Sequence, residues 1–519
     1  MKKVKRPKDR FFDKQSARGE ALTFDDVRLR TGYCGFRPEE LSFETMLSRR
    51  VPLKIPVVAS PMDSVTGWEM ATAMAKLGGF GVIHFNFPTA KDQAREARRV
   101  WHHLNGRIEQ PVTVRDTDSI EKVEAMQNER NLTFHSFPAL DEADRLGGLL
   151  TRNDFDFCED KSKLVRDVMT PRAELITAPF ETTVGQAYDI MRRNKKKILP
   201  LVDGAMKLIG MYVFSDVQRI VTGSSSLYNL DANGHLRCGA AVGILDDAFE
   251  RIELLGRYVS AIVIDNAHGD FEDYIETLRQ IKKKEWPFDV IVGNISEGES
   301  AKRLVDAGAD GLRVGQGGGS ICISRKQGGY GCPQVTAVYE VKKAIGNSGV
   351  PVCSDGGIVH AGDVPIAIGA GAHSVMVGKA IAATKESPGE IITREVEIIT
   401  ASGQKVRQVM QGKIYRGMGS AEAVRERAGS RGRYQADSPL FIPEGEKVFE
   451  PYKGEVFRPI NHLLGGLRIG MLKVGARTID EMIEKTNFWR ITSAGLRESG
   501  AHDVIIVGDD ESSYRRSGT

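Results

Sequence analysis

The sequence predicts a (β/α)₈ barrel, an α/β fold, with a smaller domain inserted into it. Eight short apolar runs have the length of buried strands, and all but one of them end in Gly, Ser, Asp or Asn. Amphipathic stretches such as residues 300–309 and 335–345 separate most of these runs. Apolar strands that alternate with helices favour a parallel sheet covered by helices, and eight units favour a closed barrel. An open, doubly wound sheet is the alternative. The runs cover residues 56–60, 81–84, 239–243, 261–265, 290–294, 311–315, 351–355 and 374–378.

The predicted insertion lies between the second and third runs, where the regular spacing is interrupted. Two halves of this segment repeat one order: strand, helix, strand, strand, and the Asp-containing start of a helix. We expect these elements at residues 111–114, 119–130, 137–140 and 147–154, and again at 174–177, 183–193, 198–202 and 209–216. The repeat resembles a pair of CBS motifs (a Bateman domain), a tandem module that often binds adenine or guanine nucleotides. A structural insertion without a ligand is the alternative.

The predicted domain organisation follows from these boundaries. Residues 1–109 form an N-terminal arm and the first part of the barrel, residues 110–222 the tandem module, and residues 223–519 the rest of the barrel with its C-terminal tail. Residues 1–10 are basic and are expected to be a frayed arm. Residues 397–411 predict a β-hairpin with Ser402 and Gly403 at its turn. Residues from about 419 to 454 are polar and rich in Gly, Arg and Glu, which predicts a mobile flap without regular structure.

Composition and charge narrow the class of protein. The net charge is +3, from 72 basic and 69 acidic residues, so no large polyanion such as nucleic acid is expected as a partner. The basic start has no apolar stretch behind it, unlike a secretory signal, and no run approaches the roughly 18 apolar residues of a membrane span. Six cysteines are scattered along 519 residues, which favours reduced thiols and a cytoplasmic enzyme.

Cys322 is the predicted nucleophile of that enzyme. It follows the sixth strand in the sequence GQGGGSICIS (residues 315–324), and barrels carry their active sites at the carboxyl ends of the strands. Four glycines among residues 315–319 let the backbone turn sharply, so the thiol is expected to be exposed, and the loop amides with Ser320 can bind a phosphate. Cys332 is the rival. The remaining cysteines, Cys34, Cys158, Cys238 and Cys353, are expected to be packed and inert.

The next strand ends predict a nucleotide. Asp355 ends the seventh run and can accept hydrogen bonds from both hydroxyls of a ribose. Gly357 after it, and Gly378 with Lys379 after the eighth run, lie in the loops that commonly hold phosphate in barrels. A plain turn is the alternative explanation for Gly356 and Gly357. Polar groups after the fourth and fifth runs, Asp265 and Asn294, are placed to hold a second ligand, and His268 is expected to have a structural or cofactor-contact role.

Several segments together resemble the IMP dehydrogenase/GMP reductase family. They are residues 21–27 (ALTFDDV), 60–63 (SPMD), 84–86 (HFN), the Cys322 loop with 331–334 (GCPQ), 415–420 (YRGMGS) and 498–500 (ESG). The resemblance covers essentially the whole chain, including the tandem CBS insertion. It implies that Cys322 attacks C2 of IMP, that hydride passes to NAD⁺, and that hydrolysis of the thioimidate yields XMP.

The resemblance also implies roles for individual residues. Phosphate would be held by Ser320, Gly357, Gly378, Lys379 and Tyr415, ribose by Asp355, and hypoxanthine by Met418, Gly419 and Glu444. Asp265, Asn294 and Arg313 would line the nicotinamide side. K⁺ would be bound by backbone carbonyls of Gly317, Gly319 and Cys322, completed by Glu498, Ser499 and Gly500 of a neighbouring subunit. This last assignment implies a homotetramer, with an octamer as an open alternative.

GMP reductase, which converts GMP to IMP with NADPH, is the competing activity because it uses the same cysteine. It needs no base that activates water, whereas the flap of the dehydrogenases carries an Arg-Tyr pair for this purpose. Arg433 and Tyr434 match that pair, and Ser324 keeps a hydroxyl where the family usually has Thr. Lys379 replaces a residue that is often Ser, and Gly328-Gly329-Tyr330 is unusual for the catalytic loop. A nucleotide sensor without catalysis is a third hypothesis, which the intact Cys322, Asp355 and Arg433 disfavour.

Overall fold

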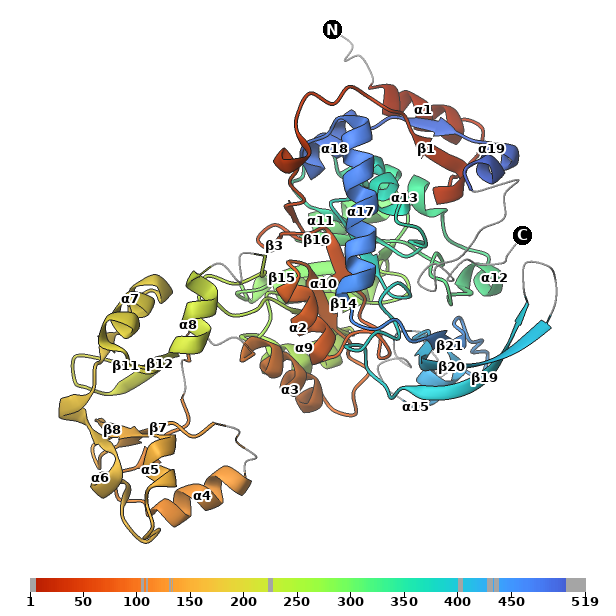
Figure 1. Cartoon of the computed structure of the whole chain (residues 1–519). Helices are drawn as coiled ribbons and strands as arrows, with labels where there is room; N and C mark the ends of the chain where they lie inside the picture. Colours follow the sequence, from red (N-terminus) through yellow and green to blue (C-terminus); the bar gives the residue numbers. More distant parts are fainter. Residues whose placement is uncertain are drawn as a thin grey trace. The chain divides into compact units, whose positions relative to one another are not determined.

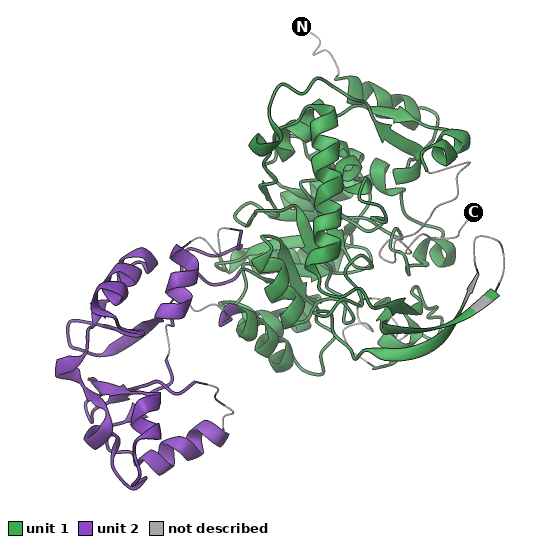
Figure 2. Ribbon diagram, viewed as in Figure 1, with its two compact units in different colours: residues 1–100, 237–519 green, residues 101–236 purple. Residues whose placement is uncertain are grey.

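The computed structural model describes residues 6–103, 107–108, 111–129, 132, 134–222, 227–399, 405–426, 433 and 438–500. Two compact units divide the chain: one comprises residues 1–100 and 237–519, the other residues 101–236 (Figure 2). The inserted unit is therefore wider at both ends than the range 110–222 expected from the repeat. Among the described residues, no helix combines the length and apolar character needed to cross a membrane.

The larger unit is built on a closed, eight-stranded parallel barrel, which confirms the predicted fold (Figure 1). Each predicted run contains or overlaps one barrel strand, and an open sheet is excluded because β18 pairs with β4. In order around the barrel the strands are β13 (Gly239–Val242), β14 (Ala261–Asp265), β15 (Asp289–Ile295), β16 (Gly311–Val314), β17 (Val352–Asp355), β18 (Ser374–Val377), β4 (Val57–Ala59) and β5 (Phe80–Ile83).

Helices follow the strands along the chain and cover the barrel. They are α2 (Trp68–Lys76), α3 (Ala90–Trp101), α9 (Leu245–Leu255), α10 (Glu272–Lys283), α11 (Gly298–Asp306), α13 (Gln334–Ile345), α14 (Asp363–Ala370), α17 (Phe457–Val474) and α18 (Ile479–Lys485). Inside the barrel, side chains from different strands form one buried cluster that includes Val58, Phe80, Val263, Ile291 and Cys353. The interior is thus a packed core, and Cys353 is buried as predicted.

The N-terminal expectation was wrong in part. Helix α1 (Pro7–Ser16) begins inside the segment expected to be a frayed arm. Phe12 on this helix is buried and stacks on Tyr339 of α13, with ring centroids 3.9 Å apart. Burial of that aromatic ring stabilises the helix on the barrel. The adjoining strand β1 (Val27–Leu29) pairs antiparallel with β22 (Phe488–Arg490), so both ends of the described chain are fixed to the same unit.

A second sheet follows the eighth barrel strand. It contains β19 (Ile392–Ile399), β20 (Lys405–Arg416) and β21 (Lys447–Pro451). The antiparallel pairing of β19 with β20 confirms the predicted hairpin, whose turn lies outside the described residues. The segment from 419 to 454 was expected to lack regular structure. This was wrong at both ends of the segment. Helix α15 (Ala421–Glu426) lies near its start, and β21, near its end, pairs antiparallel with β20 along its whole length.

The inserted unit consists of two similar halves, each with its own small core. In the first, β6 (Val114–Arg115) pairs parallel with β7 (Phe137–Leu140), which pairs antiparallel with β8 (Leu146–Leu150). In the second, β10 (Ala178–Pro179), β11 (Ile198–Val202) and β12 (Leu208–Val213) repeat that pattern. The helices are α4 (Ile120–Glu129), α5 (Arg152–Asp156), α6 (Val165–Val168), α7 (Val184–Asn194) and α8 (Phe214–Val221).

One strand of the repeat was placed wrongly. Residues 174–177 were expected to form a strand, but residues 172–174 form a 3₁₀ turn and the strand β10 comes later. Pro171 and Pro179, which lack a backbone N–H, flank this stretch and restrict where a ladder can form. Further short elements among the described residues include β2 (Thr45–Met46), β3 (Pro52–Leu53), β9 (Thr170–Pro171), α12 (Ser324–Gly328) and α19 (Ser493–Glu498).

Candidate active site

A cavity opens at the carboxyl ends of the barrel strands, and charged side chains form one side of it. Arg313 on β16 lies between two carboxylates: its Nη1 is 2.7 Å from Asp265 Oδ1 and its Nε is 2.8 Å from Asp355 Oδ2. Asn294 on β15 donates a hydrogen bond from Nδ2 to the same oxygen of Asp355, at 2.8 Å. Since Arg313 and Asp265 are almost fully buried, each charge depends on its partner for the solvation it has lost.

A second arginine, Arg433, reaches this group from residues 419–454, the segment predicted as the flap and called the distal segment below. The Nη1 of Arg433 forms an ion pair with Asp265 Oδ2, and the Arg433 side chain lines the cavity. Asp265 therefore has one arginine on each carboxylate oxygen. The neighbouring Tyr434, predicted as its catalytic partner, lies outside the described residues. The fold thus brings Arg433 to the strand ends although the chain places it far from them.

The glycine-rich loop after β16, residues 315–319, lines the cavity. Gly315 has φ +146°, and a Cβ on it would lie 2.0 Å from the backbone oxygen of Asp355, so only glycine fits there. Arg325 stabilises the loop from inside, because its guanidinium donates hydrogen bonds to the carbonyls of Gln316 and Cys332. The result is a turn that carries Cys322 to the mouth of the barrel.

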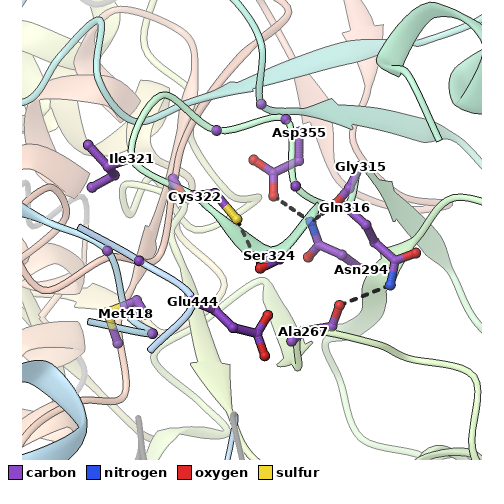
Figure 3. A pocket seen from close by; sticks show the side chains of 18 of the residues that line it. Ala267, Asn294, Gly315, Gln316, Ile321, Cys322, Ser324, Asp355, Met418 and Glu444 are labelled. Carbon is purple, nitrogen blue, oxygen red and sulfur yellow. Dashed lines mark hydrogen bonds between the residues drawn. The ribbon is translucent and has the colours of Figure 1, made fainter. Parts of the chain in front are cut away.

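Cys322 lies in the cavity with its sulfur directed at a hydroxyl (Figure 3). Its Sγ is 3.1 Å from Ser324 Oγ. The backbone around it is tied to the distal segment by two hydrogen bonds, from Ile323 N to the Glu444 carbonyl and from Glu446 N to the Ile321 carbonyl, both of 2.9 Å. The thiol is only partly buried, which leaves it accessible to a ligand. A nucleophile beside a hydrogen-bonding hydroxyl is suited to covalent catalysis.

The other cysteines are less suited to that role. Burial raises the pKa of the Cys332 thiol to about 11, and it raises the pKa of Cys238 and of Cys353 to about 12. A thiol with so high a pKa contains almost no thiolate at neutral pH. Cys332 does not line the cavity, in contrast to Cys322.

Another side of the cavity comes from the end of β20 and the segment after it. Met418 and Gly419 line it together with Glu444 and Tyr415. Burial is the main reason that the pKa of Tyr415 is raised, so its phenol stays protonated. A Cβ on Gly378 would lie 3.1 Å from the Tyr415 oxygen, which places the ends of β18 and β20 against each other.

Most of the residues predicted from the sequence meet in this one cavity. Those that line it are Asn294, Arg313, Gly317, Gly319, Cys322, Ser324, Asp355, Tyr415, Met418, Gly419, Arg433 and Glu444. Others are placed around it without lining it: Ser320, Gly357, Gly378, Lys379 and Asp265. Residues Glu498, Ser499 and Gly500 are exposed at the end of α19 and do not line it either.

Some lining residues were not predicted. Gln316 accepts a hydrogen bond from Ser296 and donates one to the Ala267 carbonyl at 3.0 Å, which fixes its amide beside the thiol loop (Figure 3). Tyr330 donates a 2.9 Å hydrogen bond to Glu444 Oε2. The unusual Gly-Gly-Tyr sequence was the signal that could have identified Tyr330. Within the described residues, no cluster of three or more His, Cys, Asp or Glu side chains could hold a metal ion.

Comparison with known proteins agrees with this geometry. The IMP dehydrogenase / GMP reductase domain model matches residues 21–502. Inosine-5'-monophosphate dehydrogenase of Halalkalibacterium halodurans is 39% identical over 490 residues, which cover 94% of this chain and 97% of the relative. The same enzyme of Aquifex aeolicus is 40% identical, with 94% and 96% covered.

Solved structures point to the same family. A crystal structure of a cysteine-to-alanine variant of GMP reductase from Trypanosoma brucei, in complex with guanosine 5'-monophosphate, superposes with a TM-score of 0.80 at 33% identity. The match covers 93% of this chain and 98% of that one. With the barrel, the thiol loop and the family match in agreement, the chain belongs to the IMP dehydrogenase / GMP reductase family.

Proposed function

We propose that this protein oxidises IMP to XMP with NAD⁺ through a covalent intermediate on Cys322. The observation that carries the proposal is the presence of Arg433 in the cavity that holds the thiol. The overall reaction needs a nucleophile for the oxidation and then a residue that activates water for the hydrolysis. A GMP reductase would need only the nucleophile.

In the first half-reaction, the Cys322 sulfur forms a bond with C2 of the purine. The hydrogen on C2 leaves with its electron pair, and NAD⁺ accepts this hydride when bound, so the purine is oxidised. Ser324 Oγ, 3.1 Å from the sulfur, can donate a hydrogen bond that stabilises the thiolate before the attack. The product of this step is a thioimidate in which C2 is bonded to sulfur.

In the second half-reaction, water adds to C2, the C2–S bond breaks, and the thiolate is regenerated as XMP forms. Arg433 and Tyr434 are assigned to water activation, with the Ser324 hydroxyl helping to place the water. The support for this assignment is the position of Arg433: its ion pair with Asp265 keeps the side chain at the cavity that also contains Cys322. The same carboxylate also binds Arg313.

The substrate assignments combine residues that line the cavity with others placed around it. Asp355 binds the ribose, supported by the Arg313 and Asn294 contacts that fix its orientation. Met418, Gly419 and Glu444 contact the hypoxanthine, with Glu444 at N1. Asp265, Asn294 and Arg313 are assigned to the nicotinamide side. The phosphate is assigned to Ser320, Gly357, Gly378, Lys379 and Tyr415.

The proposal includes a potassium ion and a homotetramer. Backbone carbonyls of Gly317, Gly319 and Cys322 would bind K⁺, and Glu498, Ser499 and Gly500 of a second copy would complete the site. Oxygen donors suit this cation, and the exposure of residues 498–500 makes them available to a neighbour. Activity in K⁺ compared with Na⁺, and the mass in solution, test these two points.

The inserted unit is proposed to be a tandem CBS module that binds adenine or guanine nucleotides. The repeated sheet pattern of its halves, each with a separate buried core, supports this assignment. Nucleotide binding to the full chain should be lost when residues 110–222 are deleted. Equal binding to both proteins would contradict it.

One experiment separates the two activities of the family. The purified protein is given IMP, NAD⁺ and K⁺, and NADH and XMP are measured; in parallel, NADPH consumption is measured with GMP. We expect NADH and XMP. GMP reductase is the second candidate because the trypanosome structures that superpose on this chain carry that name. NADPH consumption with release of ammonia would establish it and would remove the catalytic role of Arg433.

A further inference from the structure

Tyr330 is a cavity residue to which the reaction described above gives no role. It lies in the sequence Gly328-Gly329-Tyr330-Gly331, beyond the short helix α12 that follows Cys322. Its side chain lines the same cavity as Cys322, Ser324 and Glu444. Its phenol donates a 2.9 Å hydrogen bond to Glu444 Oε2, across 114 residues of sequence.

The backbone around this tyrosine is shaped to fit the ring. A Cβ on Gly328 would lie 2.6 Å from Tyr330 Cδ1, so any larger residue there would collide with the ring. Gly329 and Gly331 have φ of +67° and +107°, a region that side chains rarely adopt. Arg325 fixes the far side of the loop through the carbonyls of Gln316 and Cys332. The glycines therefore allow the loop to direct the ring toward Glu444.

The direction of the hydrogen bond is determined by the phenol. Burial, above all other causes, raises the pKa of Tyr330, and the adjacent Glu444 carboxylate raises it further, so the phenol keeps its proton at neutral pH. A protonated phenol donates to Oε2, which leaves Oε1 of Glu444 as an acceptor for another group. Tyr330 thus holds the carboxylate assigned to the purine from the wall of the cavity that also contains Ser324 and Cys322.

We propose that Tyr330 is a positioning residue that holds Glu444 as an acceptor for the N1 hydrogen of a 6-oxopurine nucleotide. The inference rests on the proposed assignment of Glu444 to the purine. A 6-oxopurine such as IMP carries a hydrogen on N1, whereas N1 of AMP carries only a lone pair. A carboxylate oxygen held in place attracts the former and repels the latter, so the fixed orientation of Glu444 becomes a source of specificity.

The test is the affinity for IMP and for AMP, measured by calorimetry on the full chain and on Tyr330→Phe. AMP has the same ribose and phosphate as IMP, so it reports on every contact except that with the purine edge. We expect Tyr330→Phe to weaken IMP binding about tenfold, the effect of losing a hydrogen bond to a charged group. AMP binding should be unchanged or tighter, because a carboxylate that is no longer held in place repels N1 of AMP less. Tyr33→Phe is the matched control, since the Tyr33 side chain is 90% exposed; it should change neither affinity.

A double-mutant cycle with Glu444→Ala, which removes the acceptor, tests whether Tyr330 acts through Glu444. If it does, Tyr330→Phe in the Glu444→Ala background should have no further effect on IMP binding. Equal losses for IMP and AMP, or losses that add in the double mutant, would overturn the inference. Failure of this inference can be distinguished from failure of the proposed function. Protein that fails to oxidise IMP yet shows the selective loss refutes the activity alone, and protein that oxidises IMP without that loss refutes the role of Tyr330 alone.

Discussion

Two walls of the cavity are built in contrasting ways. The strand-end wall, which comprises Asn294, Arg313 and Asp355, lies on barrel strands and is backed by Asp265. It is held by polar and charged contacts between mostly buried side chains. The loop wall, which comprises Cys322, Ser324, Tyr330 and Glu444, lies on connecting segments. Main-chain hydrogen bonds between residues 321–323 and 444–446 hold it together.

The two walls are expected to contribute differently, one to the stability of the fold and the other to catalysis. A buried ion pair that loses one member leaves the other charge without compensation, and the cost falls on folding. A partly exposed thiol on a loop can be removed with little effect on folding, because its contacts with the core are few. We therefore expect substitutions in the strand-end wall to lower the free energy of unfolding and those in the loop wall to lower turnover.

The largest effect is expected from Cys322→Ala. NADH formation should fall by about 10⁴-fold or more, because the nucleophile and the covalent step are lost together. The melting temperature should remain close to that of the unchanged protein. Mass spectrometry of the protein with IMP and NAD⁺ should show no adduct. A large fall in the melting temperature would contradict the idea that the loop wall contributes little to stability.

Cys332→Ala is the control for that experiment. Because burial raises the pKa of Cys332 to about 11, its thiolate fraction at pH 8 is on the order of 10⁻³ and rises about tenfold with each pH unit up to about pH 10. The variant should therefore keep full activity. Iodoacetamide at pH 8 should label Cys332 slowly in the Cys322→Ala protein, and faster labelling at pH 10 would follow the same titration.

Arg313→Leu should produce the largest loss of stability. It leaves Asp265 and Asp355 without Arg313 as partner, and the free energy of unfolding should fall by about 3–5 kcal/mol. Urea denaturation measures it. Arg303→Leu is the matched control: the Arg303 side chain is 54% exposed and pairs with Asp270, so its loss should lower the free energy of unfolding far less than Arg313→Leu does. Equal losses would mean that Arg313 is not a structural centre of the wall.

Arg433→Ala tests the residue that joins the two walls. Hydride transfer should be retained while hydrolysis slows by about 10²-fold, since a positioned proton-transfer residue contributes at least that much. The covalent intermediate should then accumulate and appear in rapid-quench experiments as a burst of NADH. Steady-state turnover equal to that of the unchanged protein would show that the assignment of Arg433 to water activation is wrong.

The smallest effect is expected from Ser324→Ala. It removes the hydroxyl 3.1 Å from the Cys322 sulfur, and turnover should fall by about tenfold, equivalent to one hydrogen bond to a charged group. Ser324→Thr keeps the hydroxyl and should restore most of the turnover. A loss of the same size in both variants would indicate packing as the cause.

Elements whose pattern is local in the sequence were predicted correctly, and elements that depend on distant partners were not. The barrel strands were predicted nearly residue by residue, because each is a short apolar run whose pattern is local. The predicted loop and hairpin were found for the same reason. The expectations for residues 1–10 and 419–454 were wrong in part, because helix α1 depends on Tyr339 and β21 depends on β20. Such partners lie far away in the sequence, and local pattern contains no information on them.

By itself, the sequence determined the barrel, its interruption, and Cys322 as the residue at the end of the sixth strand. The tertiary structure alone decided which distant groups meet that thiol. Arg433 came to Asp265, and Tyr330 came to Glu444. The reason is physical: strands form from neighbouring residues with a regular pattern, whereas a contact between two loops depends on the closure of the barrel beneath them.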